Sequence, residues 1–369
     1  MWRRLDLTEI NVVLCGDSTE VLRQYPDAFF DSVVCDPPYG LSKEPNITEV
    51  LTKWIAGEPY DHGHGGFMGK SWDSFVPHPD LWREVFRVLK PGGHALVFAG
   101  TRTQDLMTIA LRLGGFGIRD VIEWLYFSGF PKSMDVGKAF DKRAGVLAPR
   151  GQGFNVAGQN VQLNQNRELR SDHPDYVPYS PQSELARKWD GWGTALKPAH
   201  EPIIVARKPL AGTVAETVEK YGTGAINIDG CRIATDDKMS YSSSKAMGVT
   251  SFGTGTTKQH EAGRFPANCV TTDDDAFYSP YFNVTPREVC KKATKADRGA
   301  GNTHPTVKPT ALMAWLIRLV TPPGGTVLDP FAGSGSTLVA AKREGFGYVG
   351  IEREPEYVDI ANARTKEAV

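Results

Sequence analysis

The sequence lacks apolar runs of membrane-spanning length, and its first residues lack the pattern of a signal peptide. We therefore expect a cytoplasmic chain that does not enter a membrane. The five cysteines among the 369 residues are scattered without a CxxC pair, so we expect neither disulfides nor a metal site. Positive and negative side chains nearly cancel to a net charge of −1, which leaves only a local basic face as a means of binding a polyanion.

Short apolar runs alternate with amphipathic stretches over most of the chain. This alternation predicts an α/β fold with a mixed, mostly parallel sheet and helices on its faces. The expected strands are 11–15, 31–35, 94–99, 120–127, 201–206, 326–329 and 347–352. The expected helices are 18–25, 80–90, 101–113, 310–320, 336–344 and one from 355 onward.

Three stretches lack this regular spacing. Residues 41–74 form a long segment with tryptophans, histidines and glycines, and loops of that length often bind a ligand or cover a site. Residues 131–188 and 211–302 are polar and rich in glycine, yet isolated aromatic residues recur in both. Those aromatic residues favour an irregular folded region over a disordered linker, which stays the alternative.

Asp36-Pro37-Pro38-Tyr39-Gly40 directly follows an apolar strand. The prolines stiffen the turn, and the carbonyl of Pro37 is free of any strand partner. With the Asp36 carboxylate it can form a pair of acceptors for the two N–H bonds of an amino group. Tyr39 adds a ring on which a planar group can stack. An ordinary proline turn is the competing interpretation of these residues when they are considered alone.

A second motif, VLDPFAGSGST, follows a strand near the other end of the chain. Gly333 and Gly335 would let the backbone approach a ligand closely after the strand that ends at Asp329. Leu338 stands where a dinucleotide loop would have glycine, and no Walker lysine follows, so pyrophosphate and nucleoside triphosphate binding are disfavoured. Glu352 closes the next strand, about twenty residues further on, where an acid can accept hydrogen bonds from ribose hydroxyls.

Together these two motifs resemble those of enzymes that methylate exocyclic amino groups of DNA bases with S-adenosyl-L-methionine (AdoMet). The catalytic motif precedes the cofactor loop, which is the order of the circularly permuted class called beta. The strings RVLKPGGHALVFAGTRT, WLYFSGFPKS and WGTALKPAHEPIIVARKP also resemble core segments of these enzymes. The resemblance covers about 11–135, 187–210 and 303–362, and it implies a Rossmann-like AdoMet methyltransferase core.

The resemblance also implies the functional residues. The catalytic set would be Asp36, Pro37, Pro38 and Tyr39, acting on a base flipped out of the duplex without a covalent enzyme intermediate. The cofactor set would be Asp17, His304, Lys308, Asp329, Phe331, Ala332, Gly333, Gly335, Ser336 and Glu352. Lys308 is expected to meet the carboxylate of AdoMet. For Asp17, an N-terminal helix cap is the competing role.

The same resemblance divides the chain into three parts. Residues 1–210 would be the first part of the core with an irregular insertion at about 131–188, residues 211–302 a target-recognition region, and residues 303–369 the second, AdoMet-binding part of the core. Basic residues near the end of the middle region are the candidates for contacts with DNA phosphates, with a solvated face as the alternative. They are Arg287, Lys291, Lys292, Lys295 and Arg298.

Double-stranded DNA is therefore the expected partner, and a homodimer and a cognate restriction enzyme are further partners that the family admits. Because Asp at position 36 accompanies adenine more often than cytosine in this family, we expect transfer to N6 of adenine, with N4 of cytosine as the alternative. Methylation of RNA or of a protein glutamine is a further alternative, but there the cofactor loop usually precedes the catalytic motif. An inactive binding module is disfavoured because Asp36, Tyr39, Gly333 and Gly335 are all present.

Overall fold

The structure is a computed structural model that describes residues 9–40, 43–63, 73–126, 133–146, 179–233, 261, 263–270 and 293–368. The chain divides into two compact units. The first joins Met1–Tyr126 to His200–Val369, and the second, Phe127–Ala199, is inserted between them.

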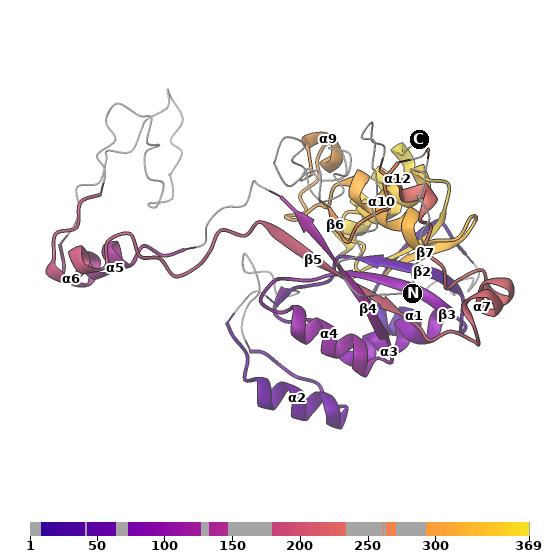
Figure 1. The fold of residues 1–369 in the computed structure, drawn as a ribbon, viewed down its shortest axis with the longest axis horizontal. Coiled ribbons are helices and arrows are strands. Elements are labelled where there is room, and N and C mark those ends of the chain that lie inside the picture. The colour runs from indigo at the N-terminus through magenta and orange to yellow at the C-terminus, as the bar shows by residue number, and fades with distance from the viewer. Residues whose placement is uncertain are drawn as a thin grey trace, which may run out of the picture. The chain divides into compact units, whose positions relative to one another are not determined.

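A sheet forms the centre of the first unit (Figure 1). Its strands are β1 (Val12–Cys15), β2 (Phe30–Cys35), β3 (Leu89–Phe98), β4 (Gly117–Leu125), β5 (His200–Arg207), β6 (Cys269–Val270), β7 (Thr326–Asp329) and β8 (Gly347–Glu352). They lie in the order β1-β8-β7-β2-β3-β5-β4-β6. Paired strands are parallel, except that β5 runs antiparallel to both β3 and β4. The predicted α/β fold with a mixed, mostly parallel sheet is confirmed.

Helices bury apolar side chains against both faces of this sheet. One cluster joins α1 (Ser18–Leu22), α2 (Ile47–Ala56), α3 (Pro79–Val88) and α4 (Gln104–Leu113) to the sheet, and the other joins α10 (Thr310–Val320) and α11 (Ser336–Arg343). Among the described residues the unit also contains α7 (Val214–Tyr221), the short 3₁₀ helix Asp229–Cys231, α9 (Lys295–Arg298) and α12 (Pro355–Glu367).

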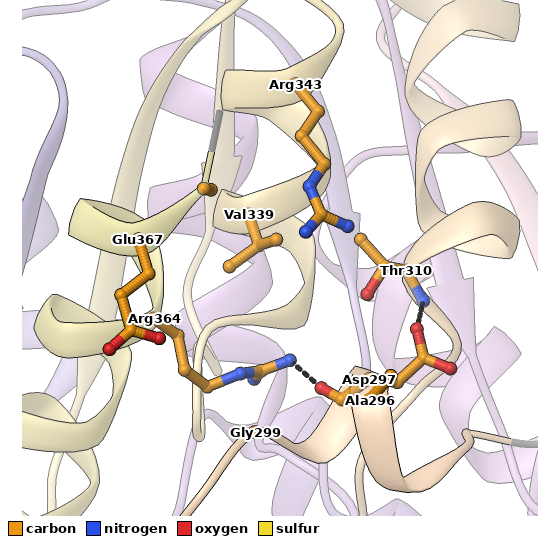
Figure 2. A pocket seen from close by; sticks show the side chains of 9 residues that line it. Ala296, Asp297, Gly299, Thr310, Val339, Arg343, Arg364 and Glu367 are labelled. Carbon is orange, nitrogen blue, oxygen red and sulfur yellow. Dashed lines mark hydrogen bonds between the residues drawn. The ribbon is translucent and has the colours of Figure 1, made fainter.

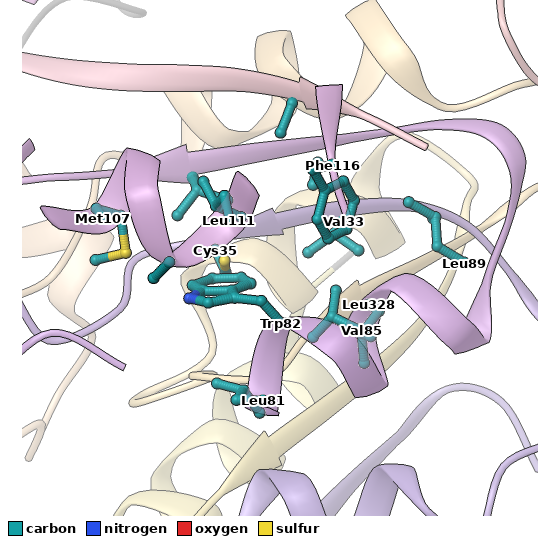
Figure 3. Packing of buried hydrophobic residues seen from close by; sticks show 14 of the residues in the cluster. Val33, Cys35, Leu81, Trp82, Val85, Leu89, Met107, Leu111, Phe116 and Leu328 are labelled. Carbon is teal, nitrogen blue, oxygen red and sulfur yellow. The ribbon is translucent and has the colours of Figure 1, made fainter. Parts of the chain in front are cut away.

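The two faces of β2 explain why its residues are nearly all apolar or small. Successive side chains of a strand point to opposite faces, so Val33 and Cys35 join the first cluster whereas Val34 joins the second. Figure 3 shows Trp82 of α3 beside Cys35, with Leu111 of α4 close to them. Burial on both faces is typical of a central parallel strand. The predicted catalytic motif begins where this buried strand ends.

Some elements differ from the predicted ones. β3 begins at Leu89 rather than at 94, because Leu89 already pairs with Phe30 of β2, and the register of the two strands then shifts before His94 pairs with Ser32. Gly92 in this irregular part of β3 has a φ of +77°, and a Cβ there would lie 2.7 Å from the side chain of Thr217 of α7. The segment 41–74, predicted as loop, contains α2, whose Trp54 is 1% exposed. An amphipathic helix within an otherwise irregular segment was missed.

In the described part of the second unit, two helices are joined by one buried carboxylate. These helices are α5 (Val136–Arg143) and α6 (Glu184–Lys188). Asp141 of α5 accepts hydrogen bonds from the Tyr179 hydroxyl and from the backbone N–H groups of Gln182 and Ser183, each at 2.8 Å. Burial favours the neutral acid, but these hydrogen bonds outweigh it and hold the pKa of Asp141 below its ordinary value. The insertion predicted at about 131–188 therefore has folded structure where it is described.

Those parts of 211–302 that the structure describes pack with the sheet of the first unit. β6 pairs with β4, and the N–H of Asn227 donates to the carbonyl of Leu319 in α10 at 2.9 Å. The role of this region in target recognition stays a prediction. Within the residues described, no helix is both long enough and apolar enough to cross a membrane.

Candidate active site

Parallel strands place several of the predicted functional residues at one edge of the sheet. The carboxyl ends of β1, β8, β7 and β2 lie side by side in that order, and Asp17, Glu352, Asp329 and Asp36 occupy or follow these four ends. The catalytic and cofactor motifs are separated by almost the whole chain, yet they meet here. A crevice beyond the carboxyl ends of the strands is where open α/β sheets usually bind their ligands.

The turn after β2 is held by side chains from other segments. The backbone N–H groups of Tyr39 and Gly40 donate to the Asp73 carboxylate at 2.9 and 3.4 Å. The hydroxyl of Thr103, at the start of α4, donates to the Tyr39 carbonyl at 2.6 Å. The helix predicted over 101–113 begins at Gln104, with Thr103 as its N-cap residue, but the Thr103 hydroxyl bonds this turn instead of the helix. These contacts preorganise Asp36 and Tyr39.

Four polar side chains converge at this turn. The Lys308 ammonium lies 2.6 Å from Oδ2 of Asp36 and 3.2 Å from Oε2 of Glu201. The Tyr39 hydroxyl lies 2.7 Å from Oδ1 of Asp36 and 3.1 Å from the same Oε2 of Glu201. Lys308 Nζ and the Tyr39 hydroxyl are also 3.1 Å apart. We call Asp36, Tyr39, Glu201 and Lys308 the charged cluster.

The antiparallel direction of β5 brings Glu201 to the catalytic edge. Phe98 at the end of β3 pairs with Ile203, and the N–H of Ala99 donates to the Pro202 carbonyl at 3.0 Å. The start of β5 therefore lies beside the end of β3, which is parallel to β2. Sequence reasoning missed Glu201. The signal available was a single acid at the start of an apolar strand, and its meaning depends on the strand direction.

Burial and charge set the ionisation of the cluster. Burial alone would lower the pKa of Lys308, but the carboxylates of Asp36 and Glu201 outweigh that effect and raise it. Burial and the same two carboxylates raise the pKa of the Tyr39 phenol, and burial together with Glu201 raises the pKa of Tyr126 to about 12. Both phenols are therefore neutral hydrogen-bond donors at neutral pH, and Lys308 is a cation.

The loop after β7 has the backbone that its glycines predict. Gly333 and Gly335 have φ values of +50° and +83°. A Cβ at Gly333 would lie 3.0 Å from Nε2 of His304, and one at Gly335 would lie 3.0 Å from the Cβ of Ala361 in α12. The N–H of Gly333 donates to one oxygen of Glu352 at 2.8 Å. The end of β8 and the loop are thus one connected structure.

Burial shifts the acids beside this loop towards their neutral forms. Asp329 is 2% exposed, and burial raises its pKa to about 7, although the N–H of Phe331 and the side chain of Thr337 donate to it. Burial likewise raises the pKa of Glu352, against the opposing effect of backbone N–H donors. Each Glu352 oxygen accepts one N–H, from Gly333 and from Glu354, at 2.8 Å. A carboxylate oxygen has two acceptor sites, so Glu352 can also accept ribose hydroxyls.

His304 lies against the same loop. Its ring contacts the ring of Tyr357 edge-on at a centroid distance of 4.5 Å, and its Nδ1 donates to the Thr306 carbonyl. Burial lowers the pKa of His304, so the neutral ring presents Nε2 as an acceptor near Gly333. Lys308 follows four positions later, and its ammonium lies in the charged cluster. Asp17 caps α1 by accepting from the N–H groups of Thr19 and Glu20, a role that is compatible with a cofactor contact. Contact with AdoMet stays a prediction for both residues.

The remaining loop residues are placed as follows. Phe331 packs near Trp82, with ring centroids 6.2 Å apart, and the N–H of Ala332 donates to the Ile351 carbonyl at 2.9 Å. Ser336 is buried at the start of α11. The structure thus brings the predicted catalytic residues and the predicted cofactor loop to one edge. Among the described residues, no three His, Cys, Asp or Glu side chains are grouped in a way that could hold a metal ion.

A cavity of about 230 Å³ lies behind the loop, between α9, α10, α11 and α12 (Figure 2). Arg343 and Arg364 point into it, and Arg364 donates to the carbonyl of Asp297. The guanidinium of Arg364 also donates to the backbone carbonyl and hydroxyl of Ser334. The lining residues are distinct from the predicted cofactor residues. Arg364 therefore supports the loop from behind, and the cavity is separate from the catalytic edge.

The predicted DNA-binding residues are only partly within the described chain. Lys295 is exposed and Arg298 is half-buried in α9, where Arg298 donates to the His304 carbonyl at 3.2 Å. Arg287, Lys291 and Lys292 lie outside the described residues. Contact with phosphates stays a prediction for all five.

Comparisons with known proteins agree with these motifs. The chain is 25% identical to the type II methyltransferase M.HindIII of Haemophilus influenzae over 281 residues, which are 75% of this chain and 64% of that protein. It is 47% identical to the type II methyltransferase M2.DpnII of Streptococcus pneumoniae over 70 residues, 19% of this chain and 26% of that protein. The matched regions thus span less than two thirds of either relative.

The structure is also similar to that of TTHA0409, described as a putative DNA modification methylase from Thermus thermophilus. The two chains are 19% identical, and their structures match with a TM-score of 0.46 over 97% of this chain and 95% of that one. A model of the N6/N4 DNA methylase family, whose members are AdoMet-dependent, matches residues 30–363. That match spans both motifs and most of the sequence, and the chain belongs to this family of DNA methylases.

Proposed function

We propose that this chain is a DNA methyltransferase that moves a methyl group from AdoMet to the exocyclic N6 of an adenine flipped out of duplex DNA. The observation that supports this best is the meeting of the Asp36–Tyr39 turn with the 329–336 loop at one edge of the sheet. Family membership supports the cofactor and an amino group of DNA as the target. The choice of adenine rests on Asp36 and is the finer part of the proposal.

The residues of the loop suit AdoMet. Gly333 and Gly335 hold backbone close to His304 and Ala361, where any side chain on the glycines would intrude. Glu352 has acceptor capacity for the ribose diol, and His304 adds a neutral acceptor beside the loop. We propose that these residues, with Asp329, hold the cofactor. When bound, AdoMet supplies a methyl group on a cationic sulfur, and transfer moves that positive charge onto the amine nitrogen.

The chain's own residues would prepare the amine. The lone pair of an exocyclic amine is delocalised into the base, so the nitrogen is a poor nucleophile. Asp36 and the carbonyl of Pro37 would accept its two N–H bonds, which favours the tetrahedral nitrogen of the transition state. Tyr39 would stack on the flipped base, and its turn is fixed by Asp73 and Thr103 before the base arrives.

The test is an analysis of products. Purified protein is incubated with AdoMet and duplex DNA, the DNA is digested to nucleosides, and methylated nucleosides are identified by mass. N6-methyladenine supports the proposal. N4-methylcytosine as the main product overturns the base assignment and keeps the amine chemistry. Absence of DNA products, with methyl transfer to RNA or to protein glutamine in parallel reactions, overturns the proposed substrate. A homodimer and a cognate restriction enzyme remain predictions that this assay does not address.

A further inference from the structure

The charged cluster contains one cation and two carboxylates. Lys308 is shared between Asp36 and Glu201, whose side chains are only 22% and 18% exposed, while its own is 11% exposed. The two phenols in contact with these acids, Tyr39 and Tyr126, are neutral. With both acids ionised, the cluster has a net charge of −1, obtained from two negative charges and one positive charge.

That net charge matters at the point where the amine reacts. During transfer the base nitrogen would bond to the methyl carbon as the bond between that carbon and the sulfonium sulfur breaks and leaves a neutral thioether. The nitrogen would become cationic and then release one of its protons to solvent. A carboxylate already paired with an ammonium at 2.6 Å offers little net charge to a second cation, because the ammonium cancels most of its field. Asp36 and Lys308 alone would therefore be nearly neutral towards the reacting amine.

Glu201 changes this balance. It binds the same ammonium at 3.2 Å, and its oxygen also contacts the Tyr39 hydroxyl. We propose that Glu201 is a positioning residue for methyl transfer: it shares the Lys308 ammonium with Asp36, so that Asp36 keeps uncompensated negative charge for the amine. This inference rests on the proposed function and assigns a role to a residue outside both motifs.

The competing explanation is structural. Glu201 would then serve only to satisfy a buried lysine, as buried ammonium groups generally need a partner. The two explanations differ in what they expect when both charges are removed. If charge balance matters, removing Lys308 should compensate for the loss of Glu201, because the net charge of the cluster returns to −1. If Glu201 only holds the local structure, removing a second member of the cluster should add to the damage.

The experiment compares four variants with the unmodified chain. Glu201→Gln leaves a cluster of net charge 0, Lys308→Met leaves −2, and the double variant Glu201→Gln/Lys308→Met restores −1. Glu219→Gln is the control, because Glu219 is an exposed acid of α7 and its loss changes the total charge equally. For each variant, single-turnover rates with duplex DNA are measured at saturating AdoMet, and the dissociation constants of AdoMet and DNA are measured by titration.

We expect Glu201→Gln to slow methyl transfer by roughly tenfold to a hundredfold, somewhat less than the removal of a group that touches the reacting atoms. AdoMet and DNA affinities should stay within about twofold, since the described contacts of Glu201 are with the cluster and Tyr126. The double variant should be at least about fivefold faster than Glu201→Gln. The control should match the unmodified chain.

A double variant no faster than Glu201→Gln would overturn the inference, and so would unchanged methyl transfer in Glu201→Gln. Failure of the proposed function is distinguishable, because the unmodified chain would then give no methylated DNA at all. Folding is checked separately by thermal unfolding. If Glu201→Gln does not fold, Glu201→Asp and Glu201→Ala are compared instead. Glu201→Asp keeps the negative charge on a shorter side chain and should transfer methyl groups faster than Glu201→Ala. Equal rates for these two variants would overturn the inference.

Discussion

Replacing Asp36 with alanine separates the chemistry of this site from its stability. The carboxylate is the charged acceptor that would face the amine, so its loss removes a preorganised group from the transition state. Such losses typically cost about 3 to 4 kcal/mol, which corresponds to roughly a hundredfold to a thousandfold in rate. We expect a fall of that size in the methyl-transfer rate of Asp36→Ala.

The charged cluster limits the accompanying loss of stability. Leaving a buried ion without any partner costs about 3 to 5 kcal/mol. In Asp36→Ala, however, Lys308 keeps Glu201 at 3.2 Å, and the Tyr39 hydroxyl keeps the same acid at 3.1 Å. Both groups thus retain an acceptor, and we expect a loss of only about 1.5 to 3 kcal/mol, comparable to one charged hydrogen bond.

The assay combines three measurements on the same preparation. Single-turnover rates report the chemical step, titration reports AdoMet affinity, and urea unfolding reports the free energy of unfolding. AdoMet affinity should stay nearly unchanged, because Asp36 acts on the amine. A variant that retains more than roughly a tenth of the rate would refute the assigned role. The rate would then have fallen less than about tenfold, whereas loss of a preorganised acceptor typically slows a reaction by about a hundredfold or more. A loss of AdoMet binding would instead place Asp36 among the cofactor residues.

Other changes have equally definite outcomes. Glu352→Ala should weaken AdoMet binding, measured by titration, and should also loosen the loop because the Gly333 N–H no longer has its acceptor. An unchanged AdoMet affinity would remove Glu352 from the cofactor site. Neutralising Lys291, Lys292 and Lys295 together should flatten the salt dependence of DNA binding, by roughly one unit of log–log slope for each phosphate that these lysines neutralise; an unaltered slope would assign them to a solvated face. Because burial raises the pKa of Asp329 to about 7, the folded state holds this proton more tightly than the unfolded chain does. The stability that Asp329 contributes should be complete below about pH 4 and lost as the pH rises through about 7, which lowers the free energy of unfolding by up to about 4 kcal/mol. Urea unfolding at several pH values measures this decline. The decline should be absent in Asp329→Asn, which cannot titrate.

The sequence was sufficient for those parts of the site that depend on local pattern. An apolar strand followed by Asp-Pro-Pro-Tyr, and another followed by a glycine turn, already place Asp36 and the Gly333–Gly335 loop at strand ends. Parallel strands then bring such ends to the same edge, whatever their separation in the chain. The burial of β2 on both faces could likewise be inferred from its composition.

Contacts that depend on long-range packing could not be predicted in this way. Thr103 is the N-cap residue of α4, yet its hydroxyl bonds the carbonyl of Tyr39, 64 residues away. Asp73 lies in a segment predicted only as a loop, and it holds two N–H groups of the catalytic turn. Either side chain would have been a reasonable local cap or turn residue. Only the packing of α4 and of the end of segment 41–74 against the turn decides their partners.

Lys308 has contacts that its motif did not predict. The family resemblance predicts that it meets the carboxylate of AdoMet, and that contact stays a prediction. In the structure Pro309 precedes α10 as its N-terminal cap residue, and the Lys308 ammonium lies over the ring of Phe98 at 4.8 Å and between Asp36 and Glu201. A parallel β5 would have carried Glu201 to the opposite edge and left Lys308 with one acid. The antiparallel direction of that single strand therefore places Asp36, the proposed catalytic carboxylate, in a cluster with a second acid.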